Sequence, residues 1–420
     1  MATVGDKLSE EKTIRYLVIL VLLLIFFGVV MVYSSSFIYA KEAFNNSRYF
    51  FVRQLLFALL GPLAIFLASK LSFNFIYKHG MKIGIFVIVL LLLTFIPGVG
   101  MQVKGAHRWL SVGGFNLQPG EFSKYLLLFP TIYLFENFYS MKLSERVNLL
   151  LVVAAPLGIL TLQPDFGMFA VCLLVIAFIC LMSSFPRKIL YSFLFSGVVA
   201  GAFLIFMAPY RMQRILTFLD PWKDPQKSGF QIIQSYLALA NGGIFGKGLA
   251  NGDEKLLYLP EAHNDFIFSV VGEELGFIGI FILVVAFIIL AYFGFKLAIR
   301  AQNRVVMIFI SAVTFILALQ AFLNMGVVLG LLPTKGLNLP FISYGGSSLI
   351  SNCLAIGLVI SAFKMNLKEI RDREELASEK FTDQEKKNEV KKETEEKKEE
   401  LHDNETAIAT TNTIIVEEFK

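Results

Sequence analysis

Long apolar runs are the feature of this sequence that most limits its fold. They recur along most of the chain, at about residues 16–33, 50–68, 83–99, 122–138, 147–162, 166–181, 190–208, 266–295, 305–332 and 348–363. An α-helix needs roughly 17 to 25 such residues to cross the hydrocarbon layer, and it satisfies every backbone polar group there. The sequence therefore predicts an all-α polytopic membrane protein with about ten transmembrane helices.

Composition agrees with a membrane protein and excludes several other classes. Hydrophobic residues make up 56% of the chain and charged residues 17%, whereas a soluble domain is about a quarter charged. The three cysteines lie inside apolar runs without a CxxC pair and the four histidines are scattered, which argues against a disulfide framework and a zinc site. The first run ends without a cleavage site, so we interpret it as a signal anchor.

The charges divide the chain into three parts. Residues 366–420 hold 11 Lys and Arg against 17 Asp and Glu, a net charge of −6, which leaves +11 for the rest. A segment so charged and so poor in apolar residues does not fold alone. We therefore expect a short N-terminal segment (1–15), a membrane domain (16–365) and a tail (366–420) that is disordered or a fluctuating helix. The basic domain suits an anionic partner or reflects the positive-inside bias.

Basic residues mark one side of the membrane. Alternate short loops carry them, namely Lys7, Lys12, Arg15, Lys70, Lys78, Lys82, Lys142, Arg146, Arg187, Lys188, Lys296, Arg300, Arg304, Lys364 and Lys368. By the positive-inside rule these loops and both termini are cytoplasmic. The opposite loops, at 34–49, 100–120, 163–165, 209–265 and 333–347, then face outward. The large loop 210–265, between spans 7 and 8, is rich enough in apolar residues to be ordered.

Polar groups gather in four of the outward segments, and at membrane depth such groups suggest function. The first segment holds Lys104, Arg108, Trp109, Gln118, Glu121 and Lys124. Pro119 suits a helix start, which places Glu121 and Lys124 at i and i+3 on one face. That pair fits a structural ion pair as well as an anion site, and Trp109 fits interfacial anchoring as well as function.

The second segment is the turn Gln163-Pro-Asp165, and the third runs from Asp220 to Phe268. Asp165 suits a helix N-cap as well as a functional role. Gln231, Gln234 and Ser235 belong to the third segment. In it, Asp265 stands at a loop-to-helix junction with Glu261, His263 and Asn264 around it, and a capping role alone does not explain that group. Glu273 and Glu274 lie inside the following apolar run, where they need partners for either a structural pair or a proton path.

The fourth segment, residues 332–348, is broken by prolines and glycines. Such breaks direct backbone groups toward a cavity rather than lipid. It contains Lys335 and the run Ser343, Tyr344, Gly345, Gly346 and Ser347. The glycines could present amides to an anion at a helix N-terminus, or they could serve a turn alone.

These four segments together closely resemble the shape, elongation, division and sporulation family of peptidoglycan glycosyltransferases. The resemblance rests on Lys104-Gly-Ala-His-Arg-Trp-Leu with Gln118-Pro-Gly-Glu-Phe-Ser-Lys, on Gln163-Pro-Asp, on Leu259-Pro-Glu-Ala-His-Asn-Asp-Phe-Ile-Phe, and on Leu332-Pro with Ser343-Tyr-Gly-Gly-Ser-Ser. It covers about residues 16–363. Gly120 and Asn264 depart from the family's usual Ser and Thr, and Pro333-Thr-Lys-Gly336 is typical of division-type members.

The resemblance implies polymerisation of lipid II into β-1,4-linked glycan at the outer face of the cytoplasmic membrane, for septal wall synthesis. It implies Asp265 as the catalytic base. The predicted substrate contacts are Lys104, Arg108, Trp109, Gln118, Glu121, Lys124, Gln163, Asp165, Gln231, Gln234, Ser235, His263, Lys335, Ser343, Tyr344, Gly345, Gly346 and Ser347. A divalent cation, Mg²⁺ or Mn²⁺, stays open, and no other cofactor is expected.

The resemblance also implies partners and leaves alternatives. The expected partners are a class B penicillin-binding protein transpeptidase, other division proteins and membrane lipids, with no nucleic acid. A lipid II flippase, an elongation-type polymerase and a non-enzymatic scaffold are the alternative functions. A flippase should carry polar groups through to the cytoplasmic face, whereas here they crowd the outer segments. A scaffold leaves the order of the four segments unexplained.

Overall fold

A computed structural model describes residues 4–418 except 104, 113–114, 188–190, 193–194, 196, 198, 200–208, 227–228, 254–260 and 335. Its contacts divide the chain into two units, Met1–Met365 and Asn366–Lys420. Each unit is described by itself.

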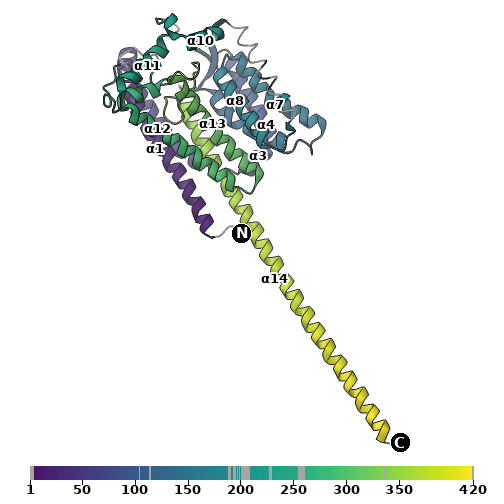
Figure 1. The fold of residues 1–420 in the computed structure, drawn as a ribbon. Helices are drawn as coiled ribbons and strands as arrows, with labels where there is room; N and C mark the ends of the chain where they lie inside the picture. The colour runs from purple at the N-terminus through teal and green to yellow at the C-terminus, as the bar shows by residue number, and fades with distance from the viewer. Residues whose placement is uncertain are drawn as a thin grey trace. The chain divides into compact units, whose positions relative to one another are not determined.

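Long apolar helices make up the first unit (Figure 1). Within the described ranges, six helices are long and apolar enough to span a membrane: α1 (Val4–Phe44), α2 (Tyr49–Ala68), α7 (Leu143–Leu162), α12 (Ile267–Arg300), α13 (Arg304–Val328) and the first part of α14 (Gly346–Glu418). Two shorter apolar helices are α4 (Gly80–Leu92), continued by η1 (Leu93–Phe95), and α8 (Phe166–Met182). The predicted class, an all-α polytopic membrane protein, is confirmed. The predicted seventh span, 190–208, lies mostly outside the described residues.

The first helix is longer than predicted. The outward loop was expected to begin at Ser34, but α1 continues to Phe44. Its serines are buried because each hydroxyl has a partner: Ser34 donates to Glu274, while Ser35 and Ser36 donate to the carbonyl of Val32. Polar side chains satisfied in this way do not end a helix.

The predicted fourth span is broken in two. The structure has α5 (Pro119–Leu126) and α6 (Leu128–Glu136) in place of one helix over 122–138. Pro130 explains the break, because its ring clashes with the carbonyl four residues earlier and its nitrogen donates no hydrogen bond. The start of α5 at Pro119 is as predicted.

The outward segments contain structure of their own. Residues 100–117 form an antiparallel sheet, β1 (Gly100–Val103), β2 (Ala106–Val112) and β3 (Phe115–Leu117), which was not predicted from the sequence. The large loop contains α10 (Pro209–Leu219), η2 (Pro221–Lys223) and α11 (Phe230–Gly242), so its described part is ordered as predicted.

A short helix, α3 (Phe73–Lys78), joins α2 to α4.

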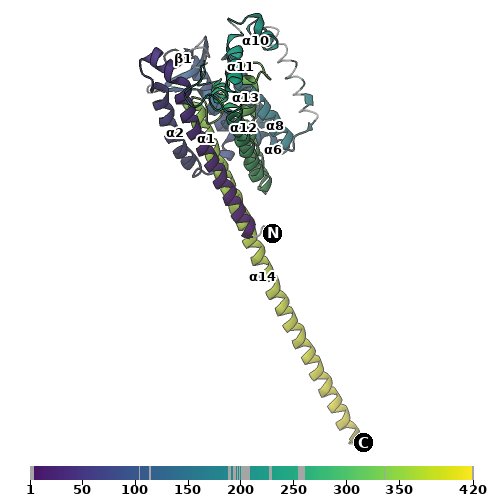
Figure 2. The same cartoon turned by 60° about the vertical axis from the view of Figure 1, so that its left-hand side comes forward.

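The outward segments share one end of the first unit. Figures 1 and 2 show α10 and α11 at the end of the bundle away from the start of α1, and Figure 2 places β1 at that same end. α12, which follows the large loop, packs against α13, α11 and α1. The loops that were predicted to face one side of the membrane therefore lie together.

The tail continues α14 as a helix to Glu418. From the sequence we expected disorder or a fluctuating helix there. Lys and Glu are good helix formers, and opposite charges three or four residues apart add some stability. This composition accounts for a helix that owes little to tertiary packing.

A kink in α12 holds the large loop against the bundle. Gly276 adopts φ 67° and ψ −166°, a region open only to glycine. A Cβ at this position would overlap the backbone of Gly246 and Ile244. The loop also donates from Lys247 N and Gly248 N to the carbonyls of Glu273 and Glu274.

We therefore expect Gly276→Ala to lower the free energy of unfolding by about 1–3 kcal/mol or more. The matched control is Gly158→Ala in α7, where a Cβ meets no atom within 4 Å and should add up to about 1 kcal/mol through helix propensity. Thermal unfolding of both variants in one detergent measures the difference. Equal melting temperatures would show that the kink is not needed.

Candidate active site

Hydrogen bonds join all four polar segments. Arg108 of β2 donates from Nε to the carbonyl of Gln163 (3.2 Å) and from its terminal nitrogen to the carbonyl of Pro164 (2.5 Å). Gln118 N donates to the hydroxyl of Ser347 (3.0 Å), which links the first segment to the fourth. Tyr344 N donates to the carbonyl of His263 (2.9 Å), which links the fourth to the third. The segments that the sequence singled out separately thus form one site.

Asp265 lies half-buried in this site. α12 begins at Ile267 with Phe266 at its N-cap, so Asp265 is not the cap that its type also allowed. Its Oδ2 lies 3.2 Å from the point that a Cβ on Gly336 would occupy. The carboxylate therefore faces the backbone of the fourth segment at a position that carries no side chain.

The polar residues next to Asp265 have distinct environments. Asn264 donates to the Glu261 carboxylate at 2.5 Å. His263 is 7% exposed and lies among the rings of Tyr39, Phe50 and Tyr344, with centroids 5.8, 4.3 and 5.7 Å away. This aromatic packing leaves the His263 ring little surface for the predicted sugar contact.

Asp165 is both a helix cap and a member of the site. Its carboxylate accepts from Met168 N (3.3 Å) at the start of α8 and from Gln118 Nε2 (3.4 Å), with Arg108 Nε 4.0 Å away. Burial raises the pKa of the Asp165 carboxyl, while the Arg108 guanidinium and the bond from Met168 act in the opposite direction. The capping interpretation is confirmed, and the carboxylate also helps to hold a basic side chain that is 32% exposed.

Two residues predicted to bind sugar point into the protein instead. Gln163 is 2% exposed and donates to the carbonyl of Leu91 (3.0 Å) and the hydroxyl of Thr94 (2.8 Å). Ser235 is fully buried and bonds the hydroxyl of Ser269 (2.7 Å) and the carbonyl of Val328 (3.0 Å). Both fix helices to one another, so these contacts argue against the sugar roles.

Gln231 and Gln234 remain half-buried on α11, and Trp109 is half-buried in β2 opposite Met101. Their predicted roles stay predictions. Lys104 and Lys335 lie outside the described residues.

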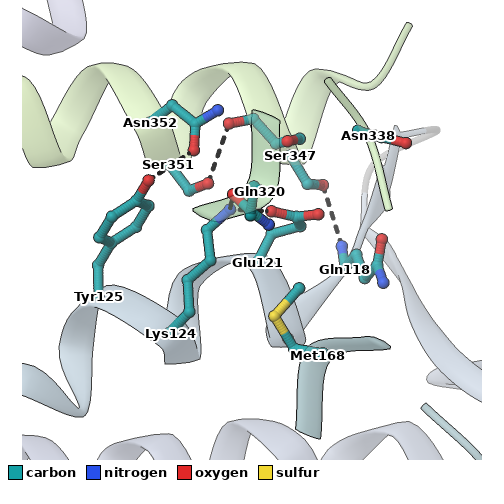
Figure 3. A network of polar contacts seen from close by, with 12 residues as sticks. Gln118, Glu121, Lys124, Tyr125, Met168, Gln320, Asn338, Ser347, Ser351 and Asn352 are labelled. Carbon is teal, nitrogen blue, oxygen red and sulfur yellow. Dashed lines mark hydrogen bonds and ion pairs between the residues drawn. The ribbon is translucent and has the colours of Figure 1, made fainter. Parts of the chain in front are cut away.

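The C-terminal end of the first segment, on α5, contains a buried charged network (Figure 3). Lys124 is fully buried, and its Nζ donates to Glu121 (2.5 Å) and to Gln320 of α13 (2.9 Å). Next to it, the hydroxyl of Tyr125 donates to Asn352 of α14 at 2.8 Å. Lys124 and Glu121 therefore form the structural ion pair that the sequence allowed, and a direct contact between Lys124 and a substrate anion would require rearrangement.

The glycine-rich end of the fourth segment is closely packed. Gly345 N donates to Gln54 Oε1 at 3.4 Å, and the hydroxyl of Ser343 donates to the carbonyl of Asn264 at 2.7 Å. A Cβ on Gly346, where α14 begins, would overlap the ring of Phe57. The Phe57 ring leaves no space for a side chain at position 346, which explains the glycine there. The anion-binding role of this run stays a prediction.

Several residues that hold the site were missed from the sequence. Gln54, Gln320 and Asn324 are buried polar residues of α2 and α13. These residues could have been noticed because they lie inside apolar runs, where a polar group is costly without a partner. Glu273 and Glu274 do have partners: Glu273 accepts from Asp253 N (2.7 Å) and Glu274 from Ser34 (2.6 Å).

Metal-ligating residues do not cluster in the part of the chain that the structure describes. No three His, Cys, Asp or Glu side chains gather there in a way that could hold an ion. A protein-built cation site among these residues is therefore not supported.

Comparisons with known proteins all point to one family. Residues 14–368 match the family model for FtsW, RodA and SpoVE, described as "Cell cycle protein". "Probable peptidoglycan glycosyltransferase FtsW" of Geobacter metallireducens is 42% identical over 371 residues, covering 84% of this chain and 96% of the relative. "Stage V sporulation protein E" of Bacillus subtilis is 38% identical, with coverage of 82% and 95%.

Solved structures show the same fold. RodA of Thermus thermophilus matches with a TM-score of 0.61 and 27% identity, covering 83% of this chain and 95% of that one. A chain from a study described as "Structural coordination of polymerization and crosslinking by a peptidoglycan synthase complex" matches with a TM-score of 0.68 and 28% identity, covering 84% and 98%.

Proposed function

The chain belongs to the FtsW/RodA/SpoVE family, and on that premise we infer that it is a peptidoglycan glycosyltransferase that polymerises lipid II into β-1,4-linked glycan. The family resemblance predicted from the four segments is thereby confirmed. The hydrogen bonds that join those four segments at one end of the bundle support placing the reaction there.

The reaction needs a base and a stabilised leaving group. The base takes the proton of the acceptor 4-hydroxyl as that oxygen attacks the anomeric carbon. Pyrophosphate leaves as an anion, so a second carboxylic acid of the glycosidase kind is not required. We assign the base to Asp265, because this residue is half-buried at the junction of the loop and α12, and its carboxylate lies beside the backbone of Gly336.

The departing pyrophosphate needs cations, because developing negative charge is stabilised by fixed donors. Arg108 is the best supported among the described residues, since its guanidinium is anchored by two carbonyls and remains partly exposed. Lys104 and Lys335 are further candidates from the sequence motifs. The proposal includes no step through Mg²⁺ or Mn²⁺, because the described residues do not fit such an ion by themselves.

The relatives suggest where and with whom the enzyme works. Its FtsW-named relatives support septal synthesis in cell division. The match to a peptidoglycan synthase complex that couples polymerisation to crosslinking supports a synthase partner. We propose a class B penicillin-binding protein as this partner, with other division proteins around the pair.

The enzyme is tested with purified full-length protein and labelled lipid II, with and without the transpeptidase. Formation of glycan strands is the expected result. Transbilayer movement of lipid II in vesicles without polymerisation would favour the flippase alternative.

The proposed topology has both termini in the cytoplasm, because the basic loops alternate along the chain. A reporter fused after Leu249 should be extracytoplasmic, and one fused after Asn366 should be cytoplasmic. Protease accessibility in spheroplasts measures both. Finding the two reporters on one side would overturn the arrangement.

A further inference from the structure

Three consecutive carbonyls of the Asp265 segment each accept a hydrogen bond from elsewhere in the protein. The carbonyl of His263 accepts from Tyr344 N (2.9 Å) and that of Asn264 from the hydroxyl of Ser343 (2.7 Å). The carbonyl of Asp265 accepts from Nδ2 of Asn324 at 2.8 Å. The segment is a turn before α12 in which Asn264 N and Phe266 N donate to the carbonyl of Glu261. The three external donors tie this turn to α13 and to the fourth segment.

Asn324 differs from the other two donors because it lies on α13, outside the third and fourth segments, and bonds the backbone of both. The same Nδ2 also donates to the carbonyl of Leu337 at 2.8 Å. Leu337 follows Gly336, the residue whose Cβ position lies 3.2 Å from Asp265 Oδ2. One amide on α13 therefore sets the spacing between the Asp265 segment and the backbone that faces the Asp265 carboxylate.

The orientation of the Asn324 amide is determined by its partners. An NH₂ group can donate twice, and two carbonyls require two donors. The reverse orientation would place the amide oxygen against two carbonyl oxygens. The side chain is 2% exposed, and its Oδ1 has no hydrogen-bond partner among the described residues. A buried polar atom without a partner is costly, so the two donated bonds are what makes an amide suitable here.

We propose that Asn324 is a positioning residue for glycan polymerisation, which holds Asp265 against the Gly336–Leu337 backbone. This inference rests on the proposed role of Asp265 as the base. Asn324 touches neither the sugar nor the transferred proton. It acts through Asp265, by keeping the carboxylate where the acceptor hydroxyl approaches.

The primary test is Asn324→Leu, which has nearly the same size and removes both donors. A misplacement of about 1 Å at a reacting group costs on the order of 10²-fold in rate. We therefore expect kcat of the purified full-length enzyme for lipid II to fall by up to about 10²-fold while KM changes little, since the lost interaction serves the transition state. Asn324→Asp, which keeps the shape but replaces the donating nitrogen by oxygen, should act in the same direction.

The matched control is Thr314→Val in the same helix. Thr314 is also buried, but its hydroxyl donates within α13 to the carbonyl of Ile310 at 2.8 Å. It should retain the wild-type kcat. Rates are compared per folded molecule, determined from the size-exclusion profile and the thermal transition, so that a loss of folded protein is not counted as a loss of rate.

A double variant separates positioning from general stability. In an Asp265→Asn background there is no base left to position, so adding Asn324→Leu should lower the residual rate no further. A further loss as large as that in the wild-type background would overturn the proposal. An unchanged kcat in either Asn324 variant would also overturn it, as would a raised KM with an unchanged kcat.

The same measurements distinguish this inference from the function on which it rests. A wild-type rate in Asp265→Asn alone removes Asp265 as the base, and the positioning role fails with it. A strong loss in Asp265→Asn beside a wild-type rate in both Asn324 variants overturns the positioning role alone.

Discussion

Asp265→Asn should lower the turnover of lipid II by about 10² to 10⁴-fold, the range over which a general base contributes. The amide cannot accept the proton of the acceptor hydroxyl at neutral pH. The substitution is nearly isosteric, and no helix cap is lost because Phe266 occupies the N-cap of α12. Lipid II affinity should therefore survive while the chemical step slows. Single-turnover polymerisation at saturating enzyme measures that step.

Asp220→Asn is the matched control for that experiment. Asp220 belongs to the same large loop, and its carboxylate is 42% exposed beside Lys223 at 3.7 Å. This variant should polymerise at the wild-type rate. A lipid II flippase in which Asp265 has only a structural role should move lipid equally well in both variants. Equal polymerisation rates for Asp265→Asn and wild type, at equal thermal stability, would remove Asp265 from the mechanism.

The membrane architecture could be predicted because its cause is local. A run of apolar residues predicts a membrane span without any knowledge of its neighbours. Most predicted spans therefore agree with the observed helices within a few residues. Two of the differences depended on contacts between distant residues. α1 extends beyond Ser34 because Glu274 accepts its hydroxyl, 240 positions away. The sheet at 100–117 requires pairing such as Met101 with Trp109, which apolar runs do not reveal.

The site could be predicted as a set of segments but not as a set of contacts. Polar groups at membrane depth identified the four segments, and hydrogen bonds between them bear this out. Sequence type does not say whether a side chain faces a cavity or a neighbouring helix. Gln163 and Ser235 have the chemistry of sugar ligands, yet both satisfy groups inside the bundle. Asn324 is one polar residue in an apolar run, and nothing in the run shows that it bridges two of the segments.

Removing one partner of the buried pair Lys124–Glu121 should destabilise the fold strongly. In Lys124→Met the Glu121 carboxylate would remain 4% exposed and without its cation, while Gln320 would lose its donor. Leaving a buried charge uncompensated costs about 3–5 kcal/mol. The exposed pair Lys223–Asp220 has the same i, i+3 spacing with side chains 81% and 42% exposed, so Lys223→Met should cost at most about 1 kcal/mol. Chemical unfolding in one detergent compares the two.

The double variant Lys124→Met/Glu121→Leu should recover most of the lost stability, because apolar residues of similar volume often replace a buried ion pair without cost. A single Lys124→Met variant as stable as the wild type would contradict the buried pair. The activity of the double variant then decides the earlier anion-binding prediction. If it folds and polymerises lipid II, both side chains serve the structure alone. If it folds but does not polymerise, Lys124 or Glu121 takes part in the reaction, and the buried arrangement must open when substrate binds.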